Sequence, residues 1–325
     1  MAESPKRTRG CFKMGCFGCL ALLGGGLIVG GCVAGLTVLE NRRSPERQQT
    51  ELLQELPQVE RPKPAEPARE VLDRSAFEID AADVSEPGRV ILDLTDGDFV
   101  IEPGEPGAPI RVEADFDKVG FELTESYEAY GETGWIYRLG YRRKSMFRFV
   151  MNQGEKNVRV ILPRDVPLTL EGEIGRGQSR VELGGLWLLE TDLELGAGDH
   201  EVSFRDPLLA PMGRFVVEGS MGKLDIRGLG NASPESVQVG HSMGALTVDL
   251  RGPWARDATV SASGSMGEMN VRLPADGVAF DVRRVGVFMG GENRRGLRDA
   301  PRPQLGMPTL SLTLKHTMGH LNVER

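Results

Sequence analysis

The sequence predicts an all-β protein: a single-chain β-solenoid with rungs of about 22 residues, preceded by one transmembrane α-helix. Three observations lead to this fold class. A long uncharged apolar run lies near the N-terminus, a glycine-centred motif recurs through the C-terminal half, and apolar and polar residues alternate strictly around that motif. A period of two is typical of strands, and a fixed longer period is typical of stacked repeats.

We divide the 325 residues into five segments. Residues 1–15 form a cytoplasmic basic tail, 16–39 the transmembrane helix, and 40–75 a linker rich in proline and glutamate. Residues 76–166 form a β-rich N-terminal part of the solenoid with an inserted hairpin, and 167–325 form the repetitive solenoid. The formal net charge of −8, together with the basic tail, leaves an acidic body, which argues against nucleic-acid binding.

Residues 16–39 carry no charged side chain. At about 1.5 Å per residue, such a helix crosses a hydrocarbon core of about 30 Å. The run is longer than the apolar region of a cleaved signal peptide, so it predicts an uncleaved signal anchor that passes once through the cytoplasmic membrane. The preceding Lys6, Arg7, Arg9 and Lys13 predict a cytoplasmic N-terminus and an extracytoplasmic body.

The anchor leaves two alternatives open. Val29-Gly30-Gly31-Cys32 resembles a lipoprotein cleavage box, so a lipoprotein anchored at Cys32 is the alternative, although the apolar run continues beyond it. Glycines spaced four residues apart allow two membrane helices to pack closely, which would produce a homo-oligomer. The simpler explanation of these glycines is that membrane helices are ordinarily rich in glycine. The residues concerned are Gly26, Gly30, Gly31 and Gly35.

The linker begins with a short predicted helix, because Ser44 and Pro45 suit a helix start. Closely spaced prolines follow and predict an extended spacer. They are Pro57, Pro62, Pro64 and Pro67.

In the repeats, each unit has a short strand, a turn that ends in glycine, and a second strand with apolar residues two, four and six positions after the glycine. The predicted turn glycines are Gly97, Gly177, Gly198, Gly222, Gly244, Gly267 and Gly319. Glycine there supplies positive φ or a close backbone approach. Met289-Gly290 keeps the motif, but charged residues follow it, which predicts that its second strand is absent or degenerate.

A methionine precedes several of these glycines, as in Met221-Gly222, Met243-Gly244 and Met266-Gly267. We interpret these methionines as core or rim fillers. A ligand groove built from them is the alternative. In the N-terminal part, the rhythm is lost between Asp115 and Asn157, where an inserted hairpin or sheet cap is expected.

The segment 215–295 carries a family resemblance. It contains Met243-Gly244-Ala245-Leu246-Thr247-Val248 and Met266-Gly267-Glu268-Met269-Asn270-Val271, followed by Arg272-Leu273-Pro274. This pattern resembles the LiaF-like C-terminal domain of the cell-wall-active antibiotics response and the adhesin-type β-solenoids called toastrack domains. The resemblance implies a membrane-anchored toastrack-like solenoid, and it implies a link to envelope-stress signalling.

Residues that carry chemistry are sparse. The histidines His200, His241, His316 and His320 lie beside repeat turns without a complete ligand or triad set, and His316-x-x-x-His320 spans a turn rather than a helix. We therefore expect no metal, no cofactor and no catalytic residue.

One segment interleaves cations with aromatic residues. Alternation places Trp135, Tyr137, Leu139 and Tyr141 on one side of a strand. The simple interpretation is an amphipathic hairpin whose aromatic residues cap the core. The alternative is a docking surface for anionic lipid, wall polymer or an acidic partner. Its residues are Trp135, Arg138, Tyr141, Arg142, Arg143, Lys144 and Arg148.

The sequence thus predicts a membrane-tethered, extracytoplasmic binding or scaffold module of the bacterial envelope, not an enzyme. Its expected partner is an envelope protein or an anionic envelope polymer. Two alternatives are a regulator of envelope-stress signalling that acts through the membrane helix, and a polysaccharide-active enzyme.

Overall fold

The structure, a computed structural model, describes residues 87–131, 134–144, 156–298 and 300–325. These residues form one 12-stranded sheet and two four-residue helices, which confirms the all-β prediction. The predicted basic tail, transmembrane helix 16–39 and linker 40–75 lie outside the described residues. Among the residues described, no helix is long and apolar enough to cross a membrane.

The strands, in chain order, are β1 (Gly88–Pro103), β2 (Arg111–Phe116), β3 (Phe121–Tyr130), β4 (Gly134–Arg143), β5 (Lys156–Leu162), β6 (Leu168–Glu182), β7 (Leu188–Ser203), β8 (Arg214–Arg227), β9 (Ser236–Asp249), β10 (Ala258–Arg272), β11 (Ala279–Asn293) and β12 (Thr309–Glu324). The helices are α1 (Leu229–Ala232) and α2 (Arg295–Arg298). Along the main path the strand order is β11-β12-β10-β9-β8-β7-β6-β1-β4-β3.

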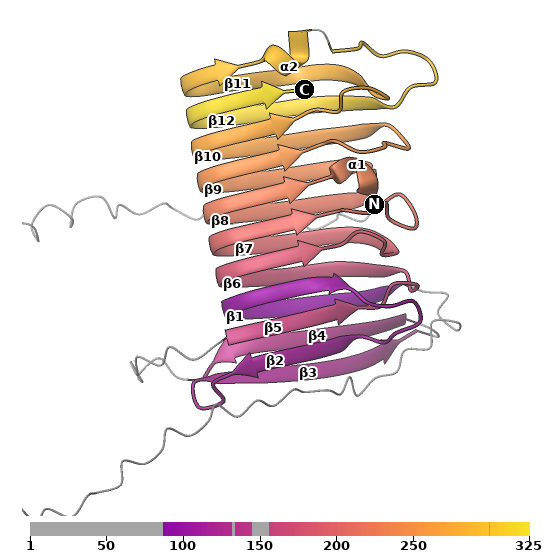
Figure 1. The fold of residues 1–325 in the computed structure, drawn as a ribbon, viewed down its shortest axis with the longest axis vertical. Helices are drawn as coiled ribbons and strands as arrows, with labels where there is room; N and C mark the ends of the chain where they lie inside the picture. The colour runs from indigo at the N-terminus through magenta and orange to yellow at the C-terminus, as the bar shows by residue number, and fades with distance from the viewer. Residues whose placement is uncertain (1–86, 132–133, 145–155, 299) are drawn as a thin grey trace, which may run out of the picture. The chain divides into compact units, whose positions relative to one another are not determined.

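Each long strand is one rung with two arms that enclose the core (Figure 1). Within the rungs β6 to β12 the motif glycines have positive φ and mark the bend between the arms. The predicted turn glycines are in register from rung to rung, as in Gly177 with Gly198 and Gly222 with Gly244. Gly244 has a φ of 123°, and a Cβ there would overlap the carbonyl oxygen of Gly222. Positive φ and close approach therefore both select glycine at this position.

Gly97 is the exception among these glycines. It aligns with Gly177 but is not among the positive-φ residues. A Cβ at Gly97 would lie 2.6 Å from the carbonyl oxygen of Lys156, so close backbone approach alone accounts for glycine here.

The N-terminal end of the described sheet is closed by two antiparallel pairs, which include the stretch after Asp115 where the rhythm of the motif is lost. The first arm of β1 pairs with β4, which pairs with β3, and the second arm pairs with β5, which pairs with β2. Phe121 stacks on the ring of Tyr141 with centroids 5.1 Å apart. The inserted residues thus extend the sheet and cover the end of the core.

The C-terminal end departs from chain order. The last strand, β12, lies between β10 and β11, as Figure 1 shows. After Gly290 the second strand is present but degenerate, which is one of the two predicted forms: β11 continues only to Asn293 in register with β12, and Glu292 and Asn293 are exposed. Leu310, Leu312 and Leu314 of β12 are fully buried, whereas Val282 of β11 is 45% exposed. Thus β12, whose buried residues are apolar except for His316, lies inside the stack, and β11 with its charged residues forms the exposed end.

Candidate binding surfaces

Outward side chains form straight rows across the rungs. Alternate residues of a strand point to opposite faces, and parallel in-register pairing places equivalent residues about 4.8 Å apart on neighbouring rungs. Every outward position after the glycine is therefore repeated on each rung. Such rows can contact an extended ligand that runs across several strands.

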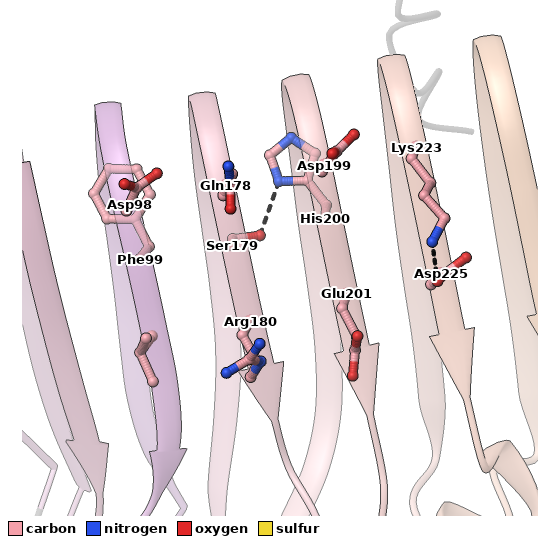
Figure 2. A pocket seen from close by; sticks show the side chains of 11 residues that line it. Asp98, Phe99, Gln178, Ser179, Arg180, Asp199, His200, Glu201, Lys223 and Asp225 are labelled. Atoms are coloured by element: carbon pink, nitrogen blue, oxygen red, sulfur yellow. Dashed lines mark hydrogen bonds and ion pairs between the residues drawn. The ribbon is translucent and has the colours of Figure 1, made fainter.

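A shallow concavity of about 330 Å³ lies where two such rows cross β1, β6, β7 and β8. We call it the polar groove (Figure 2). One row lies directly after the glycines and consists of Asp98, Gln178, Asp199 and Lys223. The other lies two residues further along each strand and consists of Val100, Arg180, Glu201 and Asp225.

Charges of both signs line the polar groove. Lys223 pairs with Asp225 through an Nζ to Oδ2 distance of 2.8 Å, and Arg227 reaches Glu201 at 3.2 Å. Burial alone would raise the pKa of Asp225, but hydrogen bonds from Lys223 and Arg227 outweigh it and hold that pKa below its usual value. Asp225 therefore stays ionised at neutral pH. At the β1–β6–β7 end of the groove, Arg180 and Asp199 are exposed to solvent.

Beneath the groove lies a polar pair that the sequence reasoning did not find. Ser179 Oγ and His200 Nδ1 are 2.8 Å apart, and the two residues are 5% and 4% exposed. Burial lowers the pKa of His200, so the ring is neutral at neutral pH. Their positions, two residues after Gly177 and Gly198, are core positions in the motif. That spacing could have shown that both side chains face inward.

Two other histidines fill space beside glycines of neighbouring rungs. Gly219, His241, Gly264 and His316 form one row that crosses β8, β9, β10 and β12. A Cβ at Gly219 would collide with the ring of His241, and one at Gly264 would collide with His316. His241 and His316 are buried, whereas His320 is exposed. The buried pair therefore acts as packing residues, each matched to a glycine.

The motif methionines are not in the core. They lie in register on β8, β9, β10, β12 and β11, at the outer side of the bend. We call this row the methionine ridge. It consists of Met221, Met243, Met266, Met318 and Met289, which are 51%, 43%, 45%, 39% and 47% exposed. The interpretation as core filler is wrong, and a rim position is confirmed.

The segment predicted as an anionic docking surface lies on β4. Trp135 and Tyr141 are 1% and 0% exposed, so both aromatic side chains pack in the core and neither can touch a ligand. Burial raises the pKa of Tyr141 above its ordinary value. Arg148 lies outside the described residues.

Arg142, Arg143 and Lys144 of this segment are exposed and Arg138 is half-buried, and all four have acidic or carbonyl partners. Arg138 contacts Glu128 at 2.9 Å, and Arg143 contacts Asp96 at 3.0 Å. Arg142 pairs with Asp93, and Lys144 donates a hydrogen bond to the carbonyl oxygen of Lys118. The structure thus gives each of the four cations its own partner, and Arg143 also lies over the ring of Phe121 at 5.5 Å from its centroid.

Within the described part of the chain, no group of three or more His, Cys, Asp or Glu side chains is arranged to hold a metal ion. The predicted helix-contact glycines Gly26, Gly30, Gly31 and Gly35, and the alternative anchor Cys32, lie outside that part.

No family model matches the chain, and no curated protein matches it. Two solved structures are similar in fold. One is a putative cell adhesion protein from Clostridium sporogenes, with 14% identity, a TM-score of 0.39, and coverage of 76% of this chain and 96% of that one. The other is a putative adhesin from Bacteroides fragilis, with 10% identity, a TM-score of 0.33, and coverage of 79% of this chain and 98% of that one.

Proposed function

We propose that this protein is a membrane-tethered, extracytoplasmic binding module of the bacterial envelope, and that an extended segment of an envelope protein binds across its polar groove. The observation that carries the proposal is the pair of in-register polar rows that line a concavity over four strands. A chain laid across the strands meets equivalent positions at regular intervals, and this suits an extended ligand better than a compact one.

The tether is supported by the sequence. The uncharged run 16–39 is long enough to span a bilayer, and the basic residues before it favour a cytoplasmic N-terminus. The linker 40–75 gives the solenoid reach away from the membrane surface. The body of the chain contains no cysteine, so it forms no disulfide in an oxidising compartment, and this is compatible with an extracytoplasmic location.

The charges of the groove favour a partner segment that carries both signs. Asp98, Asp199 and Glu201 present carboxylates, while Arg180 presents a guanidinium among them. A purely anionic polymer would meet more carboxylates than cations there. A polypeptide with alternating charges, by contrast, could pair with each sign and lose less hydration energy on binding.

Site-specific cross-linking tests the proposal. A photo-activated cross-linker at the exposed Gln178 is expected to capture one discrete partner in living cells. Arg180→Glu together with Glu201→Arg should abolish that adduct, because the double change keeps the net charge but inverts the pattern. The matched control places the cross-linker at Asn270, on the same face of β10 but outside the groove, where no adduct is expected. Capture that is equal at both positions, or unaffected by the charge swap, would contradict groove binding.

Two alternatives have separate readouts. A regulator of envelope-stress signalling requires that deletion of the gene changes a stress-induced transcriptional response. A polysaccharide-active enzyme requires that the purified chain cleaves an envelope glycan.

A further inference from the structure

We propose that the methionine ridge binds soft monovalent cations of the Cu(I) and Ag(I) class through its thioether sulfurs. This inference goes beyond the proposed function, and it uses a different set of side chains from those that line the polar groove.

The first argument is that the fold does not require methionine at this position. The same row continues onto the earlier rungs, where it is occupied by Asp96, Arg176 and Ala197. A position that accepts an acid, a base and a methyl group places no packing demand on its side chain. Nevertheless, the five neighbouring rungs from β8 to β11 all carry methionine there.

Burial does not explain the ridge either. Each of these residues leaves 39% or more of its surface in water, so it gains only part of the hydrophobic stabilisation of a core methionine. Met212 and Met269, by contrast, are fully buried and serve as ordinary packing residues.

The second argument is geometric. Neighbouring strands are about 4.8 Å apart, so consecutive ridge methionines start from Cα atoms at that separation. Metal–sulfur bonds in zinc–cysteine sites are about 2.3 Å long, and at a similar bond length two sulfurs on opposite sides of one ion lie about 4.6 Å apart. The spacing of the rungs is therefore close to the sulfur–sulfur distance at which two methionines can share one ion. The flexible, unbranched methionine side chain can close the small difference between the two distances.

The third argument concerns selectivity. Neutral, polarisable thioethers are soft ligands that favour Cu(I) over Mg²⁺, Ca²⁺ or Mn²⁺, which prefer oxygen. A thioether also needs no deprotonation to bind, unlike a thiol or an imidazole. Binding at the ridge should therefore persist in mildly acidic solution, where histidine-based and cysteine-based sites lose affinity.

The test is a titration with silver nitrate in chloride-free buffer. It uses the full-length chain labelled with ¹³C at the methionine methyl groups, with serine at Cys11, Cys16, Cys19 and Cys32 because those thiols also bind soft cations. The methyl signals of the ridge are expected to shift in a saturable way, equally at about pH 5 and about pH 7.5. The signals of Met212 and Met269 serve as internal controls and should stay in place.

Two variants make the test decisive. Met243→Leu, Met266→Leu and Met318→Leu together keep the apolar surface but remove the central sulfurs, so silver binding should be lost while the thermal midpoint stays close to that of the parent chain. Ala197→Met extends the ridge onto β7 and should add one methyl signal that responds to silver. Unchanged ridge signals at excess silver would overturn the proposal. So would undiminished binding by the triple leucine variant, and the ridge would then be an apolar surface only.

Discussion

At the scale of single residues, the glycine at each bend is the most constrained position. Gly244 combines a φ of 123° with a neighbour, the carbonyl oxygen of Gly222, that leaves no space for a Cβ. We predict that Gly244→Val destabilises the chain by at least about 2 kcal/mol, because both backbone strain and overlap act against the valine. Met243→Leu, one residue earlier and exposed, should change stability by less than about 0.5 kcal/mol.

Urea denaturation of the two variants measures this difference. Met243→Leu is the matched control, because it lies in the same bend and preserves side-chain volume. Equal midpoints for Gly244→Val and Met243→Leu would contradict the account of the bend.

His200 makes stability depend on pH. Burial lowers the pKa of its folded state below the ordinary 6.5, so the unfolded chain binds more protons than the folded one as the pH falls below that value. The stabilisation is complete above pH 6.5 and decreases toward the folded-state pKa. We predict that the thermal midpoint decreases between about pH 7.5 and about pH 5.5.

The double variant His200→Leu and Ser179→Ala isolates this contribution. It replaces the polar pair with apolar groups like those of Phe99 and Leu224, which occupy the same row. The decrease in thermal midpoint over that pH range should be smaller in the double variant than in the wild type. An identical pH dependence in both would show that His200 does not contribute. Carboxylates with lowered pKa, such as that of Asp225, act only at lower pH and do not confuse the comparison.

Much of this residue-scale picture could be predicted from the sequence. The motif contains the glycine of each bend, and strand alternation placed the aromatic residues of β4 on one side, which the structure shows to be buried. The exposure of the methionines could not be predicted, because an apolar side chain beside a turn suits either a core or a rim. The pairing of His241 with Gly219 required the register between rungs, which a single rung does not contain.

At the scale of elements, the positions of β11 and β12 in the sheet can be tested with one pair of residues that are register partners. Leu312 of β12 and Val282 of β11 are register partners, but Leu312 is fully buried and Val282 is 45% exposed. We predict that Leu312→Ala costs about 2–5 kcal/mol, as expected for a core leucine, and that Val282→Ala costs less than about 1 kcal/mol. Chemical denaturation measures both. A larger loss for Val282→Ala would place β11, not β12, inside the stack.

The cations of β4 give a second test at this scale. Replacing Arg138, Arg142, Arg143 and Lys144 with glutamine should leave the fold intact, because exposed ion pairs contribute little to stability. If these cations also dock on an anionic surface, the same variant should bind less to vesicles containing an anionic phospholipid, and the wild-type binding should weaken with salt. Wild-type chain that stays unbound at low salt would leave the cations with a structural role alone.

Element types were more predictable than their order. Alternation and turn glycines predicted the rungs and the hairpin at the N-terminal end. The insertion of β12 between β10 and β11 was not predictable from the motif, since chain order is the simplest assumption for a repeat. The physical reason is visible afterwards: every buried position of β12 is apolar except that of His316, whereas Arg283 and Arg284 interrupt the alternation in β11.

At the scale of the whole molecule, the solenoid carries two separate surfaces, the polar groove and the methionine ridge. Both surfaces arise from the same in-register stacking, which repeats one outward position on every rung. The proposed partner of the polar groove is an envelope protein, so that proposal depends on the extracytoplasmic location proposed for the chain.

The topology is tested most directly by thiol labelling of a single cysteine in a chain whose native cysteines are replaced by serine. Ser233 is unsuitable, because it is 4% exposed and has a φ of 44°, whereas Ser236 is exposed. The account predicts that Ser236→Cys reacts with a membrane-impermeant maleimide in cells whose cytoplasmic membrane is intact, once any outer membrane has been permeabilised. Labelling that appears only after lysis of the cytoplasmic membrane would contradict the extracytoplasmic location.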